Sequence, residues 1–302
     1  MSHPLLFVVV LTNNNRDDTL ACLQSLHQSG YQNMKIILLE NLALADTPEP
    51  LQHDFPNVQS IPLDKNLGYA GNNNIGIQAA MAQGAEWMLI LNDDTVLDPS
   101  CLSLLMEAAE GDSRIGILGP LVYHFDEPQV IQTAGGSLGQ YWMIGHLGQD
   151  QQDRGQFDTV RDVEWISGCA ILVRSALVNE IGMLDADYFL YWEEVEWCVR
   201  AREAGWRICH VPQAKLWHKG VKQYRNYHPK PYVTYYTTRN HLYTLRKHRA
   251  PWRAYFAAFR QIFQTLLSWS LRPKWRAQRE HRNAMWKGLV HFFQHRLGPM
   301  PS

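Results

Sequence analysis

The stretch WMLILNDD, residues 87–94, runs without a break from five apolar residues into one asparagine and two aspartates. A continuous apolar run of this length is typical of a strand that is buried on both faces of a parallel sheet. In open α/β sheets, ligands bind beyond the carboxyl ends of the strands. We therefore predict a strand over Trp87–Leu91 and a polar site directly after it, at Asn92–Asp94.

Similar apolar runs recur on both sides of this strand, and segments with helical features separate them. This alternation predicts an α/β fold, with a mostly parallel sheet flanked by helices. Polar residues also follow the first two predicted strands, at Thr12–Arg16 and at Glu40-Asn41. The expected strands are 5–11, 35–39, 58–63, 87–91, 165–173 and 206–211; the expected helices are 74–83 and 193–204, with others after Asp17 and Asp98.

The composition is that of a folded chain. Of 302 residues, 46% are hydrophobic and 19% charged, which excludes disorder as the main state. The five cysteines form no C-x-x-C pair, so they indicate neither a zinc knuckle nor a disulfide framework and fit a reducing compartment. The first residues, MSHPLLFVVVLT, lack the basic start of a signal peptide, and no apolar stretch reaches the roughly 20 residues that span a bilayer. We therefore expect a cytoplasmic protein.

The net charge of −1 hides an uneven distribution of charge. Residues 1–220 contain 12 basic and 28 acidic residues, a net −16, whereas residues 221–302 contain 16 basic residues and one acid, a net +15. This split predicts two parts, an α/β domain over 1–220 and a basic, aromatic helical extension over 221–302. The extension suits peripheral binding to an anionic membrane, packing on the acidic domain, or contact between copies of the chain.

The adjacent carboxylates Asp93 and Asp94 repel each other, so a site that keeps them together usually contains a cation. Hard oxygen ligands suit Mg²⁺ or Mn²⁺, which can also hold the phosphates of a substrate. A simple turn is the alternative, because asparagine and aspartate are common turn residues.

The segment KNLGYAGNNN, residues 65–74, leads into a predicted helix. Its glycines allow the backbone to approach a ligand closely, and a helix N-terminus favours anions. It is neither a Walker loop nor a G-x-G-x-x-G motif. A capped turn before the helix is the alternative interpretation.

Three glutamates, at 193, 194 and 196, follow the aromatic run Tyr188–Trp192. Aromatic neighbours raise the proton affinity of a carboxylate, which suits a general base, although acids also favour the start of a helix. Glu196 precedes Arg200 by four residues, which predicts a supporting pair on the surface. His218, in the sequence WHKG, could complete a metal shell, but most lone histidines are not ligands.

Five segments in this order resemble glycosyltransferase family 2, with the GT-A fold, and in particular its bacterial rhamnosyltransferase-like members. They cover most of residues 5–220 and read VVVLTNNNRDDTLACLQSL, KNLGYAGNNNIGI, MLILNDDTVLDP, WISGCAILVRSALVNEIGMLDADYFLYWEEVEWCVRAREAGWRI and WHKG. The resemblance implies an inverting transferase that needs Mg²⁺ or Mn²⁺. It would move a sugar, for example rhamnose, from a nucleotide-diphosphate donor to a hydroxyl of a glycan or lipid-linked acceptor in cell-envelope polysaccharide synthesis.

The resemblance also implies roles for single residues. Asp94 is the expected cation ligand and His218 closes the metal shell. Glu194 stands where the family places its catalytic base, usually an aspartate, and Trp192 and Glu193 lie on the acceptor side. Glu40-Asn41 match an Asp-Asn pair whose acid holds a pyrimidine, and Asp93 faces the sugar or ribose. The residues expected to bind the nucleotide sugar are Thr12, Asn14, Arg16, Glu40, Asn41, Asn66, Gly68, Asn72 and Asp93.

Two other functions are compatible with an α/β sheet of this kind. A nucleotidyltransferase would have a glycine-rich loop with lysine or arginine after the first strand, where this chain has TNNNRDD. An inactive carbohydrate- or membrane-binding module would not need acids at both 93–94 and 193–194. No nucleic-acid partner is expected, and the inner face of the cell membrane is the expected place of any peripheral contact.

Overall fold

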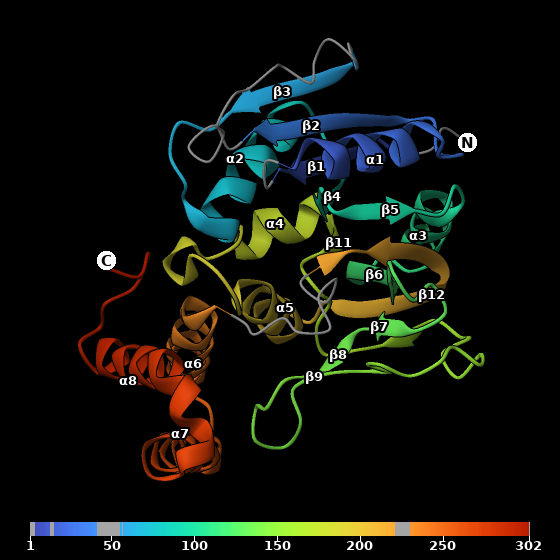
Figure 1. Cartoon of the computed structure of the whole chain (residues 1–302). Coiled ribbons are helices and arrows are strands. Elements are labelled where there is room, and N and C mark those ends of the chain that lie inside the picture. Colours follow the sequence, from blue (N-terminus) through green and yellow to red (C-terminus); the bar gives the residue numbers. More distant parts are fainter. Residues whose placement is uncertain (1–3, 13–14, 41–54, 56, 221–229, 302) are drawn as a thin grey trace.

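The computed structural model describes residues 4–12, 15–40, 55, 57–220 and 230–301. Within them, a mixed ten-stranded sheet forms the centre of the molecule, with helices on both faces (Figure 1). The strand order is β10-β12-β6-β11-β4-β1-β2-β3, with β5 and β7 paired to β12 and β6. The α/β fold expected from the sequence is confirmed.

The first half of the sheet is parallel, as predicted. It consists of β1 (Leu6–Leu11), β2 (Met34–Glu40), β3 (Val58–Pro62) and β4 (Trp87–Asn92). Because side chains alternate along a strand, β1 contributes to both faces. Its Leu6, Val8 and Val10 join the core with α1 (Arg16–His27) and α3 (Cys101–Glu110), while Phe7 and Val9 join the core with α2 (Gly68–Ala82).

The second half of the sheet contains both orientations. β11 (Ala170–Arg174) is antiparallel to β4 and to β6 (Ile115–His124), whereas β12 (Arg207–His218) is parallel to β6. The remaining elements in this part of the chain are β5 (Thr95–Leu97), β7 (Ile131–Thr133), β8 (Gly136–Ser137), β9 (Gly145–His146), β10 (Arg161–Asp162), α4 (Ser175–Ile181), η3 (Ala186–Tyr188) and α5 (Glu193–Glu203).

The carboxyl-terminal part is helical, as predicted. It consists of α6 (Pro231–Lys247), α7 (Trp252–Leu271), η5 (Pro273–Gln278) and α8 (Arg279–Phe293). These helices share an apolar cluster that includes Leu242, Leu245, Ala258 and Leu289. Figure 1 shows α6 beside α5, with α7 farthest from the sheet. The helical part therefore has a core of its own and meets the sheet domain through α6 and through the segment after α8.

Three predicted boundaries are wrong. The strand expected over 165–173 begins at Ala170, because 167–169 form a turn in which the Gly168 carbonyl accepts a hydrogen bond from the Tyr69 hydroxyl. The second helix begins at Gly68 rather than at 74, because asparagine side chains satisfy backbone donors at its start. The last strand continues from 211 to His218 through an irregular register with β6.

Candidate active site

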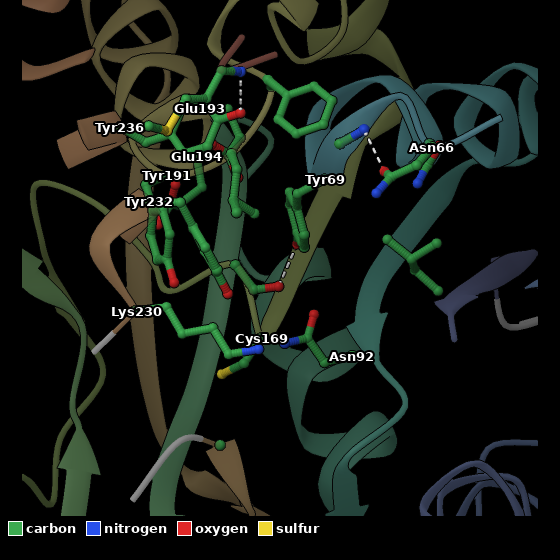
Figure 2. A pocket seen from close by; sticks show the side chains of 18 of the residues that line it. Asn66, Tyr69, Asn92, Cys169, Tyr191, Glu193, Glu194, Lys230, Tyr232 and Tyr236 are labelled. Atoms are coloured by element: carbon green, nitrogen blue, oxygen red, sulfur yellow. Dashed lines mark hydrogen bonds between the residues drawn. The ribbon is translucent and has the colours of Figure 1, made fainter. Parts of the chain in front are cut away.

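A cavity of about 1080 Å³ lies at the carboxyl ends of β1 and β4, with α6 forming part of its wall (Figure 2). This position is where a ligand is expected to bind in an open α/β sheet. The cavity brings together eight of the residues predicted from the sequence, which come from distant parts of the chain. They are Thr12, Asn66, Gly68, Asn72, Asp94, Glu193, Glu194 and His218.

Asp94 and His218 meet on one side of this cavity. The register of β5 and β12 pairs Thr95 with His218, so the last residue of β12 lies beside the turn that precedes β5. His218 Nε2 is 3.1 Å from Asp94 Oδ1. His218 Nδ1 is 2.7 Å from Gln132 Oε1, a contact in which the ring N–H donates, because an amide oxygen can only accept.

The Asp94 carboxylate is held in its charged form. Burial acts to raise its pKa, but the hydrogen bonds of His218 and of the Gly220 backbone N–H, 3.0 Å from Oδ2, outweigh burial and lower the pKa. An ionised carboxylate with an imidazole nitrogen is a donor set that suits Mg²⁺ or Mn²⁺. Among the described residues no group of three or more such side chains is found. Mg²⁺ is usually bound by one or two carboxylates together with substrate phosphates and water, so such oxygens suit the remaining positions around a cation here.

The second pair of acids, Glu193 and Glu194, lines the same cavity from the first turn of α5. Glu193 is buried and burial raises its pKa well above the usual value, with a further increase from the charge of Glu194. Burial also raises the pKa of Glu194, against backbone hydrogen bonds that lower it. The predicted desolvation of these acids is therefore present, and it suits a group that accepts a proton.

The glycine- and asparagine-rich segment lies against the loop that carries these acids. Gly68 has φ +75°, and a Cβ added to it would lie 2.1 Å from the carbonyl oxygen of Phe189. Asn66 Oδ1 accepts a hydrogen bond from the Gly68 N–H at 2.9 Å, and Asn72 Oδ1 accepts one from the Leu67 N–H at 3.0 Å. The asparagines thus fix the start of α2 and leave part of their surface on the cavity.

Four predicted site residues are not in the cavity lining. Asp93 is 1% exposed, and its Oδ2 accepts a hydrogen bond from Thr19 of α1 at 2.9 Å, on the far side of the turn from Asp94. Trp192 is buried against the ring of His241, with centroids 4.5 Å apart. Arg16 begins α1 and Glu40 ends β2. Asn14 and Asn41 lie outside the described residues.

Sequence reasoning missed several residues that line the cavity or support it. Tyr69 donates to Gly168 from within the segment 65–74, and Gln132 orients His218. The carboxyl-terminal part contributes a basic and aromatic wall, and Figure 2 shows the Lys230 amine pointing into the cavity. The aromatic composition of the tail was a signal, but it did not indicate which residues reach the site. The residues of this wall are Lys230, Tyr232, Tyr236, Lys287, Met300 and Pro301.

The predicted pair Glu196–Arg200 is present, but the prediction that it lies on the surface is wrong. The Glu196 side chain is 0% exposed, and it contacts Lys247 and His248 at the end of α6 as well as Arg200. Burial acts to raise the pKa of Glu196, but the hydrogen bond from His248 and the charges of Arg200 and Lys247 lower it to about 2. The pair is therefore part of the junction between α5 and α6.

The central sheet and the position of the cavity define the GT-A class of glycosyltransferases, and similarity to solved structures supports this fold. A mannosyltransferase from Pyrobaculum calidifontis, solved with GDP-Man and Mn²⁺, superposes with a TM-score of 0.60 at 12% identity, covering 98% of this chain and 88% of its own. The amino-terminal 349 residues of Staphylococcus aureus TarS give 0.57 at 15% identity, covering 95% and 80%.

The chain belongs to glycosyl transferase family 2, whose model matches residues 7–182, and it is therefore a glycosyltransferase. It is 29% identical over 253 residues to a protein of Mycobacterium tuberculosis named N-acetylglucosaminyl-diphospho-decaprenol L-rhamnosyltransferase, covering 77% of this chain and 81% of the relative. It is 24% identical over 258 residues to the dTDP-rhamnosyl transferase RfbF of Shigella flexneri, covering 82% and 81%. The predicted resemblance to rhamnosyltransferases of this family is confirmed.

Proposed function

We propose that this chain is an inverting, cation-dependent glycosyltransferase of cell-envelope polysaccharide synthesis. It transfers a sugar, with rhamnose as the first candidate, from a nucleotide diphosphate to a hydroxyl of a lipid-linked saccharide. The observation that carries the proposal is that one cavity contains both the ionised Asp94 beside His218 and the proton-accepting pair Glu193 and Glu194. The names of the two relatives support rhamnose and a diphosphate-linked lipid acceptor.

Asp94 and His218 are the proposed protein ligands of Mg²⁺ or Mn²⁺. A bound cation would supply positive charge to the departing diphosphate. The mannosyltransferase structure solved with Mn²⁺ supports this choice at the level of the fold. Thr12, Asn66, Gly68 and Asn72 line the same cavity and are the proposed contacts of the nucleotide sugar.

Glu194 is the proposed general base. It takes the proton of the acceptor hydroxyl while that oxygen forms a bond to the anomeric carbon, and the bond from this carbon to the diphosphate breaks, with the electron pair leaving on the diphosphate. Because this is a single displacement from the opposite side, the anomeric configuration inverts. Glu193 lies on the acceptor side, and the aromatic wall with Tyr232 and Tyr236 suits the apolar faces of a saccharide.

The experiment is a donor panel of dTDP-, UDP- and GDP-sugars, with binding measured by calorimetry with Mn²⁺ and the product anomer determined by NMR. Asp94→Asn should lose the Mn²⁺-dependent part of donor binding. Glu194→Gln should retain donor binding and lower turnover by about 10²- to 10⁴-fold, and Glu203→Gln, an exposed glutamate of the same helix, is the control. Full activity in excess EDTA would show that transfer does not need a divalent cation. A product with the anomeric configuration of the donor would contradict a single displacement.

We further propose that residues 1–220 carry the catalytic acids and that residues 221–302 form an extension that adds to the cavity wall and contacts an anionic membrane. No helix in the described part of the chain is long and apolar enough to cross a bilayer. However, α7 exposes a stripe of apolar side chains, each between 53% and 71% exposed. At the rotation of about 100° per residue in an α-helix, Arg253 and Arg260 project from the same side of α7 as this stripe. The stripe consists of Trp252, Phe256, Phe263, Leu267 and Leu271.

Liposome co-sedimentation tests this contact. Wild-type protein should bind anionic vesicles at low salt, and it should bind neutral vesicles weakly, because the cations of the extension are attracted by anionic headgroups and screened by salt. Phe256→Ser with Phe263→Ser should weaken binding, whereas Tyr141→Ser, an exposed aromatic residue outside the helices, should not. Equal binding to both vesicles, or a dimer in solution that the double variant dissociates, would contradict the proposal and favour contact between copies.

A further inference from the structure

The segment that precedes the two active-site glutamates has an unusual backbone. Phe189, Tyr191 and Trp192 have φ values of 65°, 65° and 78°, in the left-handed region that residues with a side chain rarely adopt. The Leu190 N–H also donates to the Tyr188 carbonyl at 2.8 Å, which closes a strained three-residue turn around Phe189. Such a conformation persists only where its surroundings enforce it.

Asn240 of α6 supplies much of this restraint. It is fully buried, and its side-chain amide lies within hydrogen-bond distance of three carbonyl oxygens of the segment. The distances are 3.0 Å to Tyr188, 2.9 Å to Leu190 and 2.7 Å to Tyr191. These contacts reach across about 50 residues of sequence, so they tie the turn to a different part of the fold.

The neighbours of Asn240 on α6 act on the same segment. Arg239 is also fully buried, and it donates to the carbonyls of Tyr188 at 2.9 Å and of Gly298 at 2.7 Å. Its Nε donates to Asn240 Oδ1 at 2.8 Å, which orients the amide with its N–H groups toward the segment. The ring of His241 stacks on Trp192. Three consecutive residues of α6 therefore hold the turn.

The restraint is transmitted to Glu193 and Glu194 through the backbone. Trp192 is the residue before α5, and its carbonyl accepts the hydrogen bond of the Glu196 N–H at 2.9 Å. The left-handed backbone of Tyr191 and Trp192 therefore sets the direction in which the first turn of α5 presents its side chains. A rotation of this turn would move the carboxylates relative to the cavity.

We propose that Asn240, oriented by Arg239, is a positioning residue for the general base Glu194, an inference that rests on the proposed function. Asn240 does not line the cavity. It makes no contact of its own with a bound donor, so we expect its effect on turnover and on the loop, with an unchanged Kd for the donor. A misplacement of about 1 Å at a reacting group lowers the rate by about 10²-fold.

The test compares Asn240→Asp with Thr244→Val. The first substitution keeps the shape and replaces the amide donors by a carboxylate that repels the three carbonyls. The second removes a buried hydrogen bond of 2.8 Å, between Thr244 and the Tyr188 hydroxyl, one turn further along α6. Asn240→Asp should lower kcat by about 10- to 100-fold with an unchanged Kd for donor and Mn²⁺, and Thr244→Val should change kcat by less than about threefold.

A second measurement does not depend on catalysis. Amide hydrogen exchange over 188–194 should accelerate in Asn240→Asp and remain as in wild type in Thr244→Val. If wild type transfers no sugar, the proposed function fails while the exchange experiment still decides the role of Asn240. Equal kcat losses in the two variants, or unchanged exchange in Asn240→Asp, would overturn the proposal. If Asn240→Asp does not fold, Asn240→Ser gives the same comparison.

Discussion

The buried carboxylate of Glu196 gives the sharpest stability prediction. Its oxygens are 2.8 Å from Arg200 Nε, 2.8 Å from Lys247 Nζ and 3.2 Å from His248 Nε2. The pKa is lowered from the ordinary 4.5 to about 2. At about 1.36 kcal/mol per pKa unit, this difference corresponds to about 3 kcal/mol of folding stability at neutral pH. Replacement of the charge should therefore loosen the junction of α5 and α6.

We expect Glu196→Gln to lower the free energy of unfolding by about 3 kcal/mol at pH 7, measured by urea denaturation. Because the folded-state pKa is depressed, this contribution is present above the unfolded pKa of 4.5 and is lost as the pH falls toward about 2. The gap between wild type and variant should thus be constant from pH 7 to about pH 5.5 and narrow at pH 3.5.

Glu203→Gln is the matched control. Glu203 contacts the same His248, at 2.9 Å from Nδ1, but its side chain is 55% exposed. An exposed pair of this kind contributes less than about 1 kcal/mol. Equal losses in Glu196→Gln and Glu203→Gln, or a Glu196→Gln deficit that does not change with pH, would refute the reasoning.

Two further predictions follow from the site. Gly68→Ala should reduce turnover and lower the urea midpoint more than Gly84→Ala does. Both glycines have left-handed φ values, +75° and +79°, but only an alanine at 68 would bring its Cβ against Phe189. Equal effects of the two substitutions would mean that the contact with Phe189 is unimportant. Glu193→Gln should raise the melting temperature at pH 8 and not at pH 4, since an acid whose folded-state pKa is raised by burial loses stability as the pH rises. An unchanged melting temperature at pH 8 would mean that the buried carboxyl group of Glu193 does not destabilise the folded protein at that pH.

Much of the fold could be predicted because the strands of the first half are buried on both faces. The side chains of Val8 to Val10 and of Leu89 to Leu91 are nearly inaccessible to solvent. Because every position in such a strand is buried, the sequence shows an unbroken run of apolar residues. The carboxyl ends of such strands meet at one edge, which is why Thr12 and Asp94 could be assigned to the same site. The helical start at Gly68 could not be predicted, because side chains of Asn66 and Asn72 replace the usual capping pattern.

Other parts of the site depend on contacts between distant segments. His218 reaches Asp94 only because β12 continues for seven residues beyond Val211, across an irregular register that no periodicity indicates. The opposite orientations of Asp93 and Asp94 follow from the turn between β4 and β5. The roles of Gln132 and Asn240 have no local signal, since each acts on a residue more than about 45 positions away.

The attachment of α6 to the segment 188–192 bears on how this enzyme could be recombined with its relatives. The change of charge near residue 220 suggests a crossover point for exchanging the carboxyl-terminal extension. A chimera joined there would receive a foreign α6, and the carbonyls of Tyr188, Leu190 and Tyr191 would face a helix that had not evolved with them. A crossover at Arg249–Pro251, between α6 and α7, keeps Arg239 and Asn240 with their own turn. With the proposed role of Asn240, the part of the chain that is needed for catalysis extends about one helix further than the charge pattern suggests.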